Sequence, residues 1–241
     1  MAQEEEILSL RALTVERGGR RTIDQLDLGV GAGCVYALLG GNGAGKTTTL
    51  SVFLGFVPPT AGTVQVGGQR IDQNPEAARS RVSYLPENVA LYPYLSGVEN
   101  LRYFCALAGL RLSARDASAR LAQAGLQADA HGQRVQRYSK GMRQKVGLAI
   151  AYAKGAVAML LDEPTSGLDP AATNDFSTQL RRAAQDGLGI LMATHDLFNA
   201  VQVADRIGIM RAGRLLDEFD AHRVSHAELE ATYLAHARDL P

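Results

Sequence analysis

The sequence predicts an α/β fold built on a sheet of mostly parallel strands, and three observations support this prediction. Val157–Leu161 and Ile190–Ala193 are continuous apolar runs, which are typical of parallel strands buried on both faces. Cys34–Leu39 is another apolar run, and it ends at a glycine-rich stretch that leads into a helical pattern. Between residues 88 and 155 strand-like runs give way to helical patterning. The 241 residues fit one large domain of this kind.

The first part of the chain predicts strands that pair in an antiparallel manner. Leu8–Val15 alternates loosely between apolar and polar residues, as a half-exposed strand does, and Ile23–Val30 predicts a second strand. Gly18–Arg21, between these two strands, indicates a hairpin turn. Gly62–Ile71 has the pattern of another hairpin, with its turn at Gly67-Gly68. We therefore expect an N-terminal antiparallel β subdomain beside the parallel core.

The remaining elements of the core are shorter. Thr47–Gly55 predicts a helix, and Val82–Leu85 predicts a short strand. Ile207–Met210, which Gly213 follows closely, predicts the last strand and a turn. The tail from His222 to Pro241 predicts a short helix.

Helical patterning fills the segment that interrupts the core. It is carried by Val98–Gly109, Ala114–Ala124 and Gly141–Ala153. We expect one domain in which these helices form an insertion. Its predicted parts are a core of residues 1–87 and 156–216, a helical subdomain of residues 88–155 and a tail of residues 217–241.

The composition is that of a globular protein without a dominant charge. Hydrophobic residues make up 46% of the chain and charged residues 21%, and 25 basic residues balance 25 acidic ones. A net charge of zero creates no overall field that would attract nucleic acid or anionic lipid, although it is compatible with a local basic patch. The composition therefore weakly disfavours a function on DNA.

No segment of the sequence predicts a membrane span or a secretion signal. The N-terminus MAQEEEILSL is acidic where a signal peptide is basic, and no apolar run approaches the roughly 18 residues that cross a bilayer. Cys34 and Cys105 lie far apart without metal-like spacing, which indicates apolar residues in a reducing compartment. We expect any contact with a membrane to be made through a partner protein.

A phosphate-binding loop is the first motif with specific chemistry, because it matches G-x-x-x-x-G-K-[ST] in full between a predicted strand and a predicted helix. It consists of Gly40, Gly41, Asn42, Gly43, Ala44, Gly45, Lys46 and Thr47. Its glycines let successive N–H groups approach phosphate oxygens, and the start of the following helix adds to that attraction. Lys46 would reach the β- and γ-phosphates, Thr47 would ligate Mg²⁺, and Thr48 is a further nucleotide contact. The core is therefore predicted to be a P-loop NTPase core.

Two other predicted strands end in side chains suited to hydrolysis. Val157–Leu161 precedes Asp162, which can orient Mg²⁺, and Glu163, which can polarise the attacking water as general base. An apolar strand that ends in Asp-Glu is often only a solvated strand end, but its position downstream of a phosphate loop favours the functional interpretation. His195 follows Ile190–Ala193 at another strand terminus, where open α/β sheets place ligand groups.

These motifs, taken with Tyr138–Gln144, resemble those of one family. The segment reads YSKGMRQ, which is similar to the signature usually written LSGGQ, and its Gly141 lies 21 residues before Asp162. Glu163–Asp169 resembles the end of the Walker B motif and the D-loop, and the histidine described above resembles the switch histidine. Over residues 7–216 the chain resembles the ATP-binding subunits of ABC transporters.

The resemblance implies a head-to-tail dimer that holds two ATP molecules, each between the phosphate loop of one subunit and the signature of the other. Ser139 and the backbone at Gly141 would contact a γ-phosphate across the interface, at the start of a helix whose dipole favours that charge. Asp169 would help to couple the two sites, and His195 would contact the γ-phosphate. A lone subunit would hydrolyse ATP poorly. The nucleotide contacts implied for the signature are Ser139, Lys140, Gly141 and Met142.

Three positions depart from the family pattern. Arg17 stands where an aromatic residue usually stacks on adenine; a guanidinium can also stack on a base, but Arg17 is equally compatible with plain surface charge. Gly41 replaces the usual proline of the loop. Glu87 stands where glutamine commonly ligates Mg²⁺, and a carboxylate is an acceptable ligand. This last variant is similar to that of many bacterial ABC-2 type exporters.

Further short motifs also resemble the ABC-2 branch. Tyr84–Asn88, followed by Leu91–Pro93 and Leu95–Gly97, is similar to ATPases of the nitrous oxide reductase maturation transporter and its relatives. The resemblance favours a transmembrane permease of ABC-2 type as partner and a location on the cytoplasmic face of the inner membrane. Some aromatic residues of this region fit core positions, Phe104 above all. Those in the region where the family docks its permease are Tyr92, Tyr94, Tyr103 and Phe104.

The favoured function is therefore an ATPase, paired with a second copy or a paralogue, that powers a separate permease and binds no nucleic acid. ATP binding would close the pair, and hydrolysis would reset it. The alternative is a soluble ABC-type ATPase that acts on ribosomes or DNA. Such proteins carry tandem domains, coiled coils or zinc modules, and the sequence has none of these. A non-hydrolysing regulatory subunit would lack Glu163 or His195, and both are present.

Overall fold

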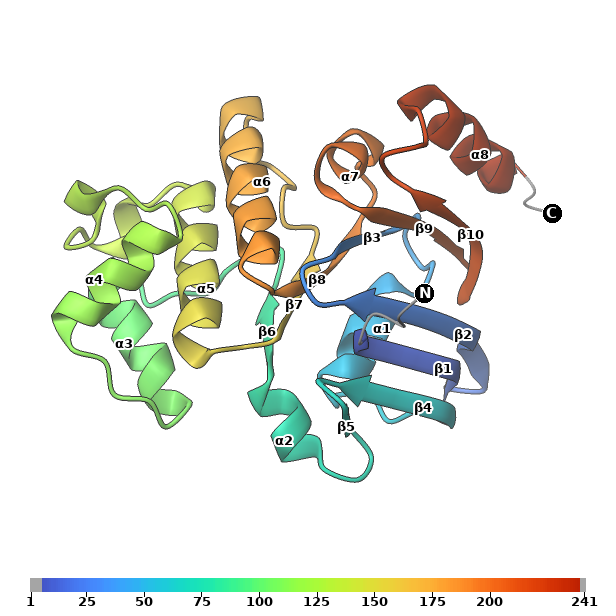
Figure 1. Ribbon diagram of the computed structural model, residues 1–241, viewed down its shortest axis with the longest axis horizontal. Helices are drawn as coiled ribbons and strands as arrows, with labels where there is room; N and C mark the ends of the chain where they lie inside the picture. Colours follow the sequence, from blue (N-terminus) through green and yellow to red (C-terminus); the bar gives the residue numbers. More distant parts are fainter. Residues whose placement is uncertain (1–5, 239–241) are drawn as a thin grey trace.

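The computed structural model describes residues 6–238 of the chain. Within this range the chain forms two sheets with one helix between them and an arm of helices at the side (Figure 1). The α/β architecture predicted from the sequence is confirmed. The last residues of the predicted terminal helix, 239–241, and the first half of the acidic N-terminal stretch, residues 1–5, lie outside the described residues.

The smaller sheet is antiparallel throughout, as its hairpins predict. Its turns lie at Gly18-Gly19 and Gly67-Gly68, where each glycine has a positive φ between 54° and 76°. Two such glycines in succession suit the tight turn whose twist matches that of paired strands. In spatial order its strands are β2 (Arg20–Gly31), β1 (Glu6–Arg17), β4 (Ala61–Val66) and β5 (Gln69–Arg70).

The larger sheet is parallel from β9 to β6, and β10 pairs antiparallel with β9 at its edge. β10 runs across residue 216, where the predicted core ends, so the sheet continues to Asp220. In spatial order its strands are β10 (Arg214–Asp220), β9 (Arg206–Arg211), β3 (Val35–Leu39), β8 (Gly189–Thr194), β7 (Ala158–Asp162) and β6 (Val82–Leu85).

The central parallel strands are buried on both faces, and their alternate residues enter two different cores. In β3, Tyr36 and Leu38 face the core shared with the smaller sheet, whereas Val35, Ala37 and Leu39 face the core beneath the helices. This double burial is the reason that the strands appear in the sequence as unbroken apolar runs.

The helix α1 (Lys46–Phe53) lies between the two sheets, where Leu50 and Phe53 are buried. The predicted helical insertion is confirmed as α3, α4 and α5, which form the arm at the left of Figure 1. The helices α2, α6 and α7 were not predicted. The remaining helices are α2 (Pro75–Ser80), α3 (Gly97–Leu107), α4 (Ala114–Gln123), α5 (Lys140–Lys154), α6 (Pro170–Gln185), α7 (Leu197–Val203) and α8 (His226–Arg238).

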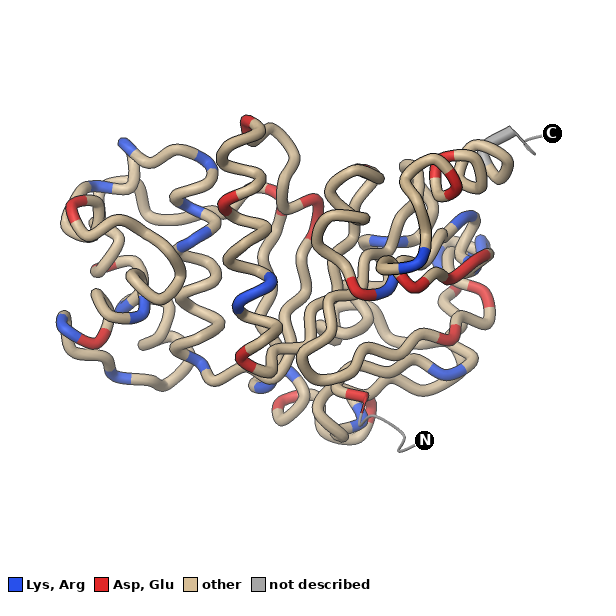
Figure 2. The backbone as a smooth tube through the Cα atoms, turned by 45° about the horizontal axis from the view of Figure 1, so that its top comes forward, with Lys and Arg blue, Asp and Glu red and all other residues tan. Residues whose placement is uncertain are grey.

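Basic and acidic residues are distributed together over the molecule. In Figure 2 basic and acidic residues both occur on the arm, on the sheets and near α8, in agreement with the zero net charge. Within residues 6–238 no helix has the length and apolar character to span a membrane.

Candidate active site

The glycine-rich loop connects the end of β3 to the start of α1, at the edge where the parallel strands terminate. Lys46 is the first residue of α1 and is only 7% exposed. Its Nζ donates to the carbonyl of Gly40 at 2.5 Å and lies 3.4 Å from that of Gly41. The loop therefore curls around the ammonium group and holds it at the position where a bound phosphate would need it.

Gly45 makes the sharp turn from the loop into α1 possible. Its φ is +110°, and a Cβ atom there would lie 2.7 Å from the Met210 side chain and 3.0 Å from the Thr22 carbonyl. Only glycine fits both the conformation and the space. Gly45 is also the N-cap of α1, and no side chain within the described residues caps the helix there. The first amides of α1 are thus available to an anion, which the helix dipole attracts.

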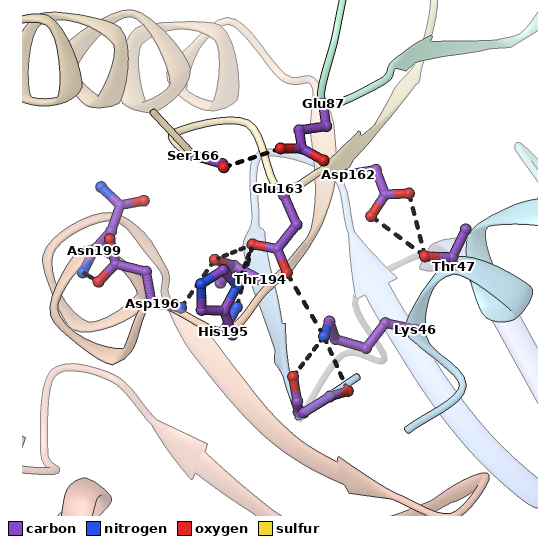
Figure 3. A network of polar contacts seen from close by, with 12 residues as sticks. Lys46, Thr47, Glu87, Asp162, Glu163, Ser166, Thr194, His195, Asp196 and Asn199 are labelled. Atoms are coloured by element: carbon purple, nitrogen blue, oxygen red, sulfur yellow. Dashed lines mark hydrogen bonds and ion pairs between the residues drawn. The ribbon is translucent and has the colours of Figure 1, made fainter. Parts of the chain in front are cut away.

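Glu163 follows β7 in a left-handed conformation with a φ of +45°, which is uncommon for a residue other than glycine. Its amide donates to the Ala193 carbonyl at 2.9 Å, so the neighbouring strand β8 fixes the turn. Its carboxylate lies 3.6 Å from Lys46 Nζ and 2.9 Å from His195 Nδ1, and it accepts from Thr194 Oγ1 at 3.1 Å (Figure 3). Lysine, glutamate and histidine from three segments thus meet at one point.

Asp162, the last residue of β7, faces α1. Its Oδ2 accepts a hydrogen bond from Thr47 Oγ1 at 3.2 Å, as Figure 3 shows. Burial raises the pKa of the Asp162 carboxyl above its ordinary value, and the Thr47 hydroxyl opposes part of that rise.

The donor set around Asp162 suits Mg²⁺. Thr47 and Asp162 supply a hydroxyl and a carboxylate in contact with each other, and Glu87 lines the same cavity. These are hard oxygen donors, and Mg²⁺ usually takes one or two carboxylates together with phosphate oxygens and water. Among residues 6–238, His, Cys, Asp and Glu side chains form no cluster of three that could hold a metal without such additional ligands.

A cavity of about 760 Å³ contains the phosphate loop and these carboxylates. Its other end is formed by the turn between β1 and β2, which contributes the exposed side chain of Arg17. No aromatic side chain belongs to the lining that the described residues provide. The lining residues are Arg17, Arg20, Arg21, Thr22, Gly41, Asn42, Gly43, Ala44, Gly45, Lys46, Thr47, Thr48, Glu87, Asp162, Glu163 and Ala212.

The signature residues lie outside this cavity in the part of the chain described here. Ser139 is the N-cap of α5 and accepts from the amide of Met142 at 3.2 Å. Asp169 is the N-cap of α6 and accepts from the amide of Ala172 at 2.8 Å. Both polar side chains therefore organise a helix start within their own subunit.

Two polar residues near the site have a contact that the sequence prediction did not assign to them. Thr194 accepts from the amide of Asp196 at 3.1 Å while it donates to Glu163, so it orients both the glutamate and the turn that carries His195. Gln144, which is fully buried in α5, donates to the carbonyl of Pro164. The position of Thr194 directly before His195, at a strand end, is the one signal that could have identified it.

Comparison with known proteins agrees with this geometry. Residues 23–166 match the ABC transporter family. The ABC transporter ATP-binding protein YdbJ of Bacillus subtilis is 35% identical over 219 residues, which are 89% of this chain and 69% of the relative. The Nod factor export ATP-binding protein I of Cupriavidus metallidurans is 36% identical, with 92% of this chain and 74% of the relative covered. The daunorubicin/doxorubicin resistance ATP-binding protein DrrA of Streptomyces peucetius is 36% identical, with 83% and 61% covered.

Solved structures have the same fold. An ATP-binding subunit of an ABC transporter superposes with a TM-score of 0.81 at 28% identity, over 95% of this chain and 99% of that one. A dimeric ATP-binding cassette bound to ADP and phosphate superposes with a TM-score of 0.76 at 22% identity, over 89% and 98% of the two chains. The phosphate loop and the residues around Glu163, together with these similarities, show that the chain is an ATPase of the ABC transporter family.

Proposed function

We propose that the chain pairs head to tail with a second copy, or with a paralogue, holds two ATP molecules in the interface and powers a separate transmembrane permease. The observation that carries the proposal is the division of the site within one chain. Lys46, Asp162 and Glu163 line one cavity, whereas the signature residues lie outside it among the described residues. A second subunit related by a two-fold axis would bring its signature to the open side of that cavity.

ATP binding uses the loop and α1. The backbone amides of the loop and the start of α1 contact the phosphates, and Lys46 exchanges the carbonyl of Gly40 for phosphate oxygens. Thr47, Asp162 and Glu87 would hold Mg²⁺, which would supply positive charge to neutralise the phosphates. The adenine then lies at the opposite end of the cavity, beside Arg17, whose guanidinium stacks on the base.

Hydrolysis uses Glu163 and His195. The carboxylate of Glu163 accepts a proton from the attacking water and is oriented by the Thr194 hydroxyl and the His195 ring. His195 is exposed and lies 2.9 Å from Glu163, which lines both the first cavity and a second one of about 390 Å³ that contains His195, so it can contact a γ-phosphate held beside Glu163. Ser139, Lys140, Gly141 and Met142 of the second subunit supply the remaining contacts, and Asp169 couples the two sites across the interface.

An aromatic patch on the arm is the docking surface for the permease. We define the patch as Tyr92, Tyr94, Tyr103 and Phe104. Tyr92 and Tyr103 pack edge to face at 4.7 Å and join their hydroxyls at 3.0 Å. Tyr94 is 76% exposed, whereas Phe104 is half-buried beneath the tyrosines, so the tyrosines make the contact. An adjacent cavity of about 260 Å³ extends the patch, and aromatic clusters of this kind are typical of interaction sites.

The permease is of ABC-2 type, and the chain lies against it on the cytoplasmic face of the inner membrane. The similarity to DrrA, a drug resistance protein, and to the Nod factor export protein supports the export branch. The likeness of Tyr84–Asn88 to the nitrous oxide reductase maturation ATPases points the same way. The mixed distribution of basic and acidic residues along the chain is unlike the basic stripe of a nucleic-acid-binding protein and favours a protein partner.

The test is an affinity purification of the tagged chain from detergent-solubilised membranes, performed with the wild type and with Glu163→Gln in the presence of ATP. Recovery of a multi-span membrane protein, enriched by the substitution, supports the proposal. A Tyr92→Ala, Tyr94→Ala double variant should lose the membrane protein but keep ATP binding. Recovery of ribosomes or DNA in its place would overturn the transport function and leave the ATPase assignment intact.

A further inference from the structure

The two arginines that flank the turn between β1 and β2 form a like-charged pair. Arg17 and Arg20 stand directly opposite each other in the register of the two strands, with only Gly18 and Gly19 between them. Side chains opposite each other in an antiparallel pair lie on one face of the sheet, with Cβ atoms about 5 Å apart. Two positive charges at this distance repel each other and destabilise the hairpin.

The next pair along the hairpin has complementary charges. Glu16 stands opposite Arg21, and their side chains form an ion pair at 3.4 Å, while Arg21 also binds Asp24 at 2.9 Å. The guanidinium groups of Arg17 and Arg20 are exposed and form no hydrogen bond or ion pair with any other residue between 6 and 238. Their positive charges are therefore available to an anion, whereas the charge of Arg21 is balanced.

The arginine pair lines one end of the cavity that contains the phosphate loop. The carboxylates of the lining gather toward the loop, where Asp162 contacts Thr47 and Glu163 lies 3.6 Å from Lys46. At the hairpin end, the described lining contains arginines and no carboxylate. The cavity thus has a second positive region, separate from Lys46, that attracts negative charge.

The strand β2 sets the distance between this second region and the phosphate loop. The carbonyl of Thr22 lies beside the start of α1, since a Cβ atom at Gly45 would be 3.0 Å from it. Arg20 precedes Thr22 by two residues, so the arginine pair begins about 7 Å farther along the strand. A group carried on the ribose of a nucleotide is within reach of the pair when the 5′-phosphates of that nucleotide lie on the loop.

We propose that Arg17 and Arg20 form a second anion site, which binds a phosphate group carried on the 2′ or 3′ position of the ribose of the bound nucleotide. The proposal rests on the proposed function, which places the 5′-phosphates on the loop and the base beside Arg17. The N–H donors of a guanidinium lie in its plane, so Arg17 offers its face to the base and its edge to the anion. Arg20 supplies a second fork of donors, and both forks suit phosphate oxygens.

A phosphate attached to the nucleotide is favoured over free inorganic phosphate. The loop holds the nucleotide in place, so the attached phosphate binds the arginine pair as part of the same molecule, at a high effective concentration. Its negative charge also relieves the repulsion between the two guanidinium groups. The ligand class is therefore adenine nucleotides with an additional phosphate on the ribose, which compete with ATP for the loop.

The experiment measures calorimetric binding of three nucleotides to the full chain, at concentrations where light scattering shows monomers. The nucleotides are ADP, adenosine 3′-phosphate 5′-diphosphate and its 2′-phosphate isomer. Because water screens contacts of exposed guanidinium groups, at least one of the two ribose-phosphorylated nucleotides should bind about 5- to 20-fold more tightly than ADP. This advantage should shrink as the ionic strength rises from about 0.05 M to about 0.5 M.

Arg20→Gln should remove the advantage of the ribose phosphate and leave the affinity for ADP unchanged, which also shows that the variant is folded. Arg20→Lys keeps the charge but not the fork, so it should retain only part of the advantage. Arg21→Gln is the matched control, because Arg21 lines the same cavity but is paired with Glu16 and Asp24. It should keep the full advantage.

Normal ADP binding without any advantage of the ribose phosphate overturns the second anion site and leaves the proposed function intact. An equal loss of affinity for all three nucleotides in Arg20→Gln overturns it as well, because Arg20 would then hold the 5′-phosphates. The same holds for an equal loss of the advantage in Arg21→Gln, and for inorganic phosphate that binds the ADP complex as tightly as the ribose phosphate does. Failure of the wild type to bind ADP would instead overturn the proposed function, and the second anion site together with it.

Discussion

Glu163 combines an unusual backbone conformation with contacts to three other residues of the site. Its left-handed backbone costs about 1–2 kcal/mol relative to an ordinary conformation. The amide bond to Ala193 and the carboxylate contacts to Lys46, Thr194 and His195 hold it there. Strain of this kind persists where surrounding structure imposes it, and here it aims the carboxylate into the cavity.

Replacement of Glu163 by glutamine should stop turnover without loss of ATP. The amide keeps the size and hydrogen bonds of the side chain but accepts a proton poorly, so kcat should fall by about 10²- to 10⁴-fold. Steady-state ATPase assays and equilibrium ATP binding check the two halves of this expectation. Glu230→Gln, on the exposed side of α8, is the control and should keep full activity. Retained turnover in Glu163→Gln would exclude Glu163 as the base.

We expect the charged carboxylate of Asp162 to lower the stability of the folded protein while it serves as a metal ligand. Burial raises the pKa of its carboxyl, so the charged form is disfavoured in the folded protein, and its contribution to stability declines as pH rises through the folded-state pKa. Asp162→Asn can keep the Thr47 hydrogen bond, and above that pKa it should raise the Tm of the metal-free protein by about 1–3 °C. Thermal unfolding in EDTA, measured over a series from about pH 4 to pH 8, tests for this gain.

The gain in Asp162→Asn should shrink toward the acid end of the series, where the wild-type carboxyl is protonated as well. Asp129→Asn, at an exposed position, is the control and should leave Tm unchanged. The same Asp162 variant should lose the Mg²⁺ dependence of nucleotide binding. A lower Tm at neutral pH would mean that the Thr47 contact outweighs the cost of burial.

Arg17 tests how the base is held. If its guanidinium stacks on adenine, Arg17→Ala should weaken ATP binding by about 2- to 10-fold, and Arg17→Tyr should restore it, since an aromatic ring offers the same planar contact. Calorimetry with ATP and with GTP measures the binding. Equal affinity in the wild type, Arg17→Ala and Arg17→Tyr would show that Arg17 is only a surface charge and does not stack on the base. Arg11, which pairs with Glu6 outside the cavity, provides the control Arg11→Ala.

At the scale of elements, α5 joins the arm to the parallel sheet by close approach. Gly147 faces β6, and a Cβ atom at this position would lie 2.1 Å from the Leu85 Cδ1 atom. Leu85 is only 1% exposed, so its side chain has little room to yield. The glycine thereby sets the distance between α5, whose start carries the signature, and the strand that leads to Glu87.

Gly147→Ala should lower the free energy of unfolding by about 1–3 kcal/mol, because the added methyl overpacks the contact with Leu85. Urea denaturation measures the change. The loss should be smaller in a Leu85→Ala background, where the shorter side chain makes room for the methyl. Gly132→Ala, in a part of the arm where a Cβ meets nothing within 4 Å, should stay within about 0.5 kcal/mol of the wild type.

The helices that sequence patterning missed have a common explanation. In α6 the buried residues Phe176, Leu180 and Ala183 follow helical spacing, but polar residues surround them and weaken the apolar signal. Its start carries a clear mark, since Asp169 caps the helix and Pro170 occupies the first turn. β10 alternates exposed and half-buried residues at the edge of the sheet, so its apolar content is too low to stand out.

At the scale of the whole molecule, one chain holds only part of the proposed site, so pairing should be visible in mixtures. Lys46→Ala lacks a working phosphate loop, and a Ser139→Arg variant lacks a working signature. Each variant by itself should be inactive. A mixed head-to-tail pair, however, contains one intact site. In that site the Ser139→Arg subunit supplies the phosphate loop and the Lys46→Ala subunit supplies the signature.

An equimolar mixture should therefore recover about a quarter of the wild-type ATPase activity, because half of the random pairs are mixed and each has one of two sites. A mixture of wild type and Lys46→Ala at the same total concentration calibrates the subunit exchange. No recovery in a mixture that light scattering shows to be dimeric would contradict the head-to-tail arrangement. Activity of either variant by itself would show that one chain is sufficient.

The sequence by itself determined the parts of this protein that depend on short-range chemistry. The Gly40–Thr47 loop, the buried parallel strands and the helical arm all carry patterns that local sterics and two-sided burial impose. Tertiary structure decided what these patterns could not contain, namely which side chain meets which across long separations. The contacts of Glu163 with Lys46 and His195, and of Glu87 with Ser166, join residues 32 to 117 positions apart. Such contacts arise only when adjacent parallel strands bring their ends to one edge of the sheet.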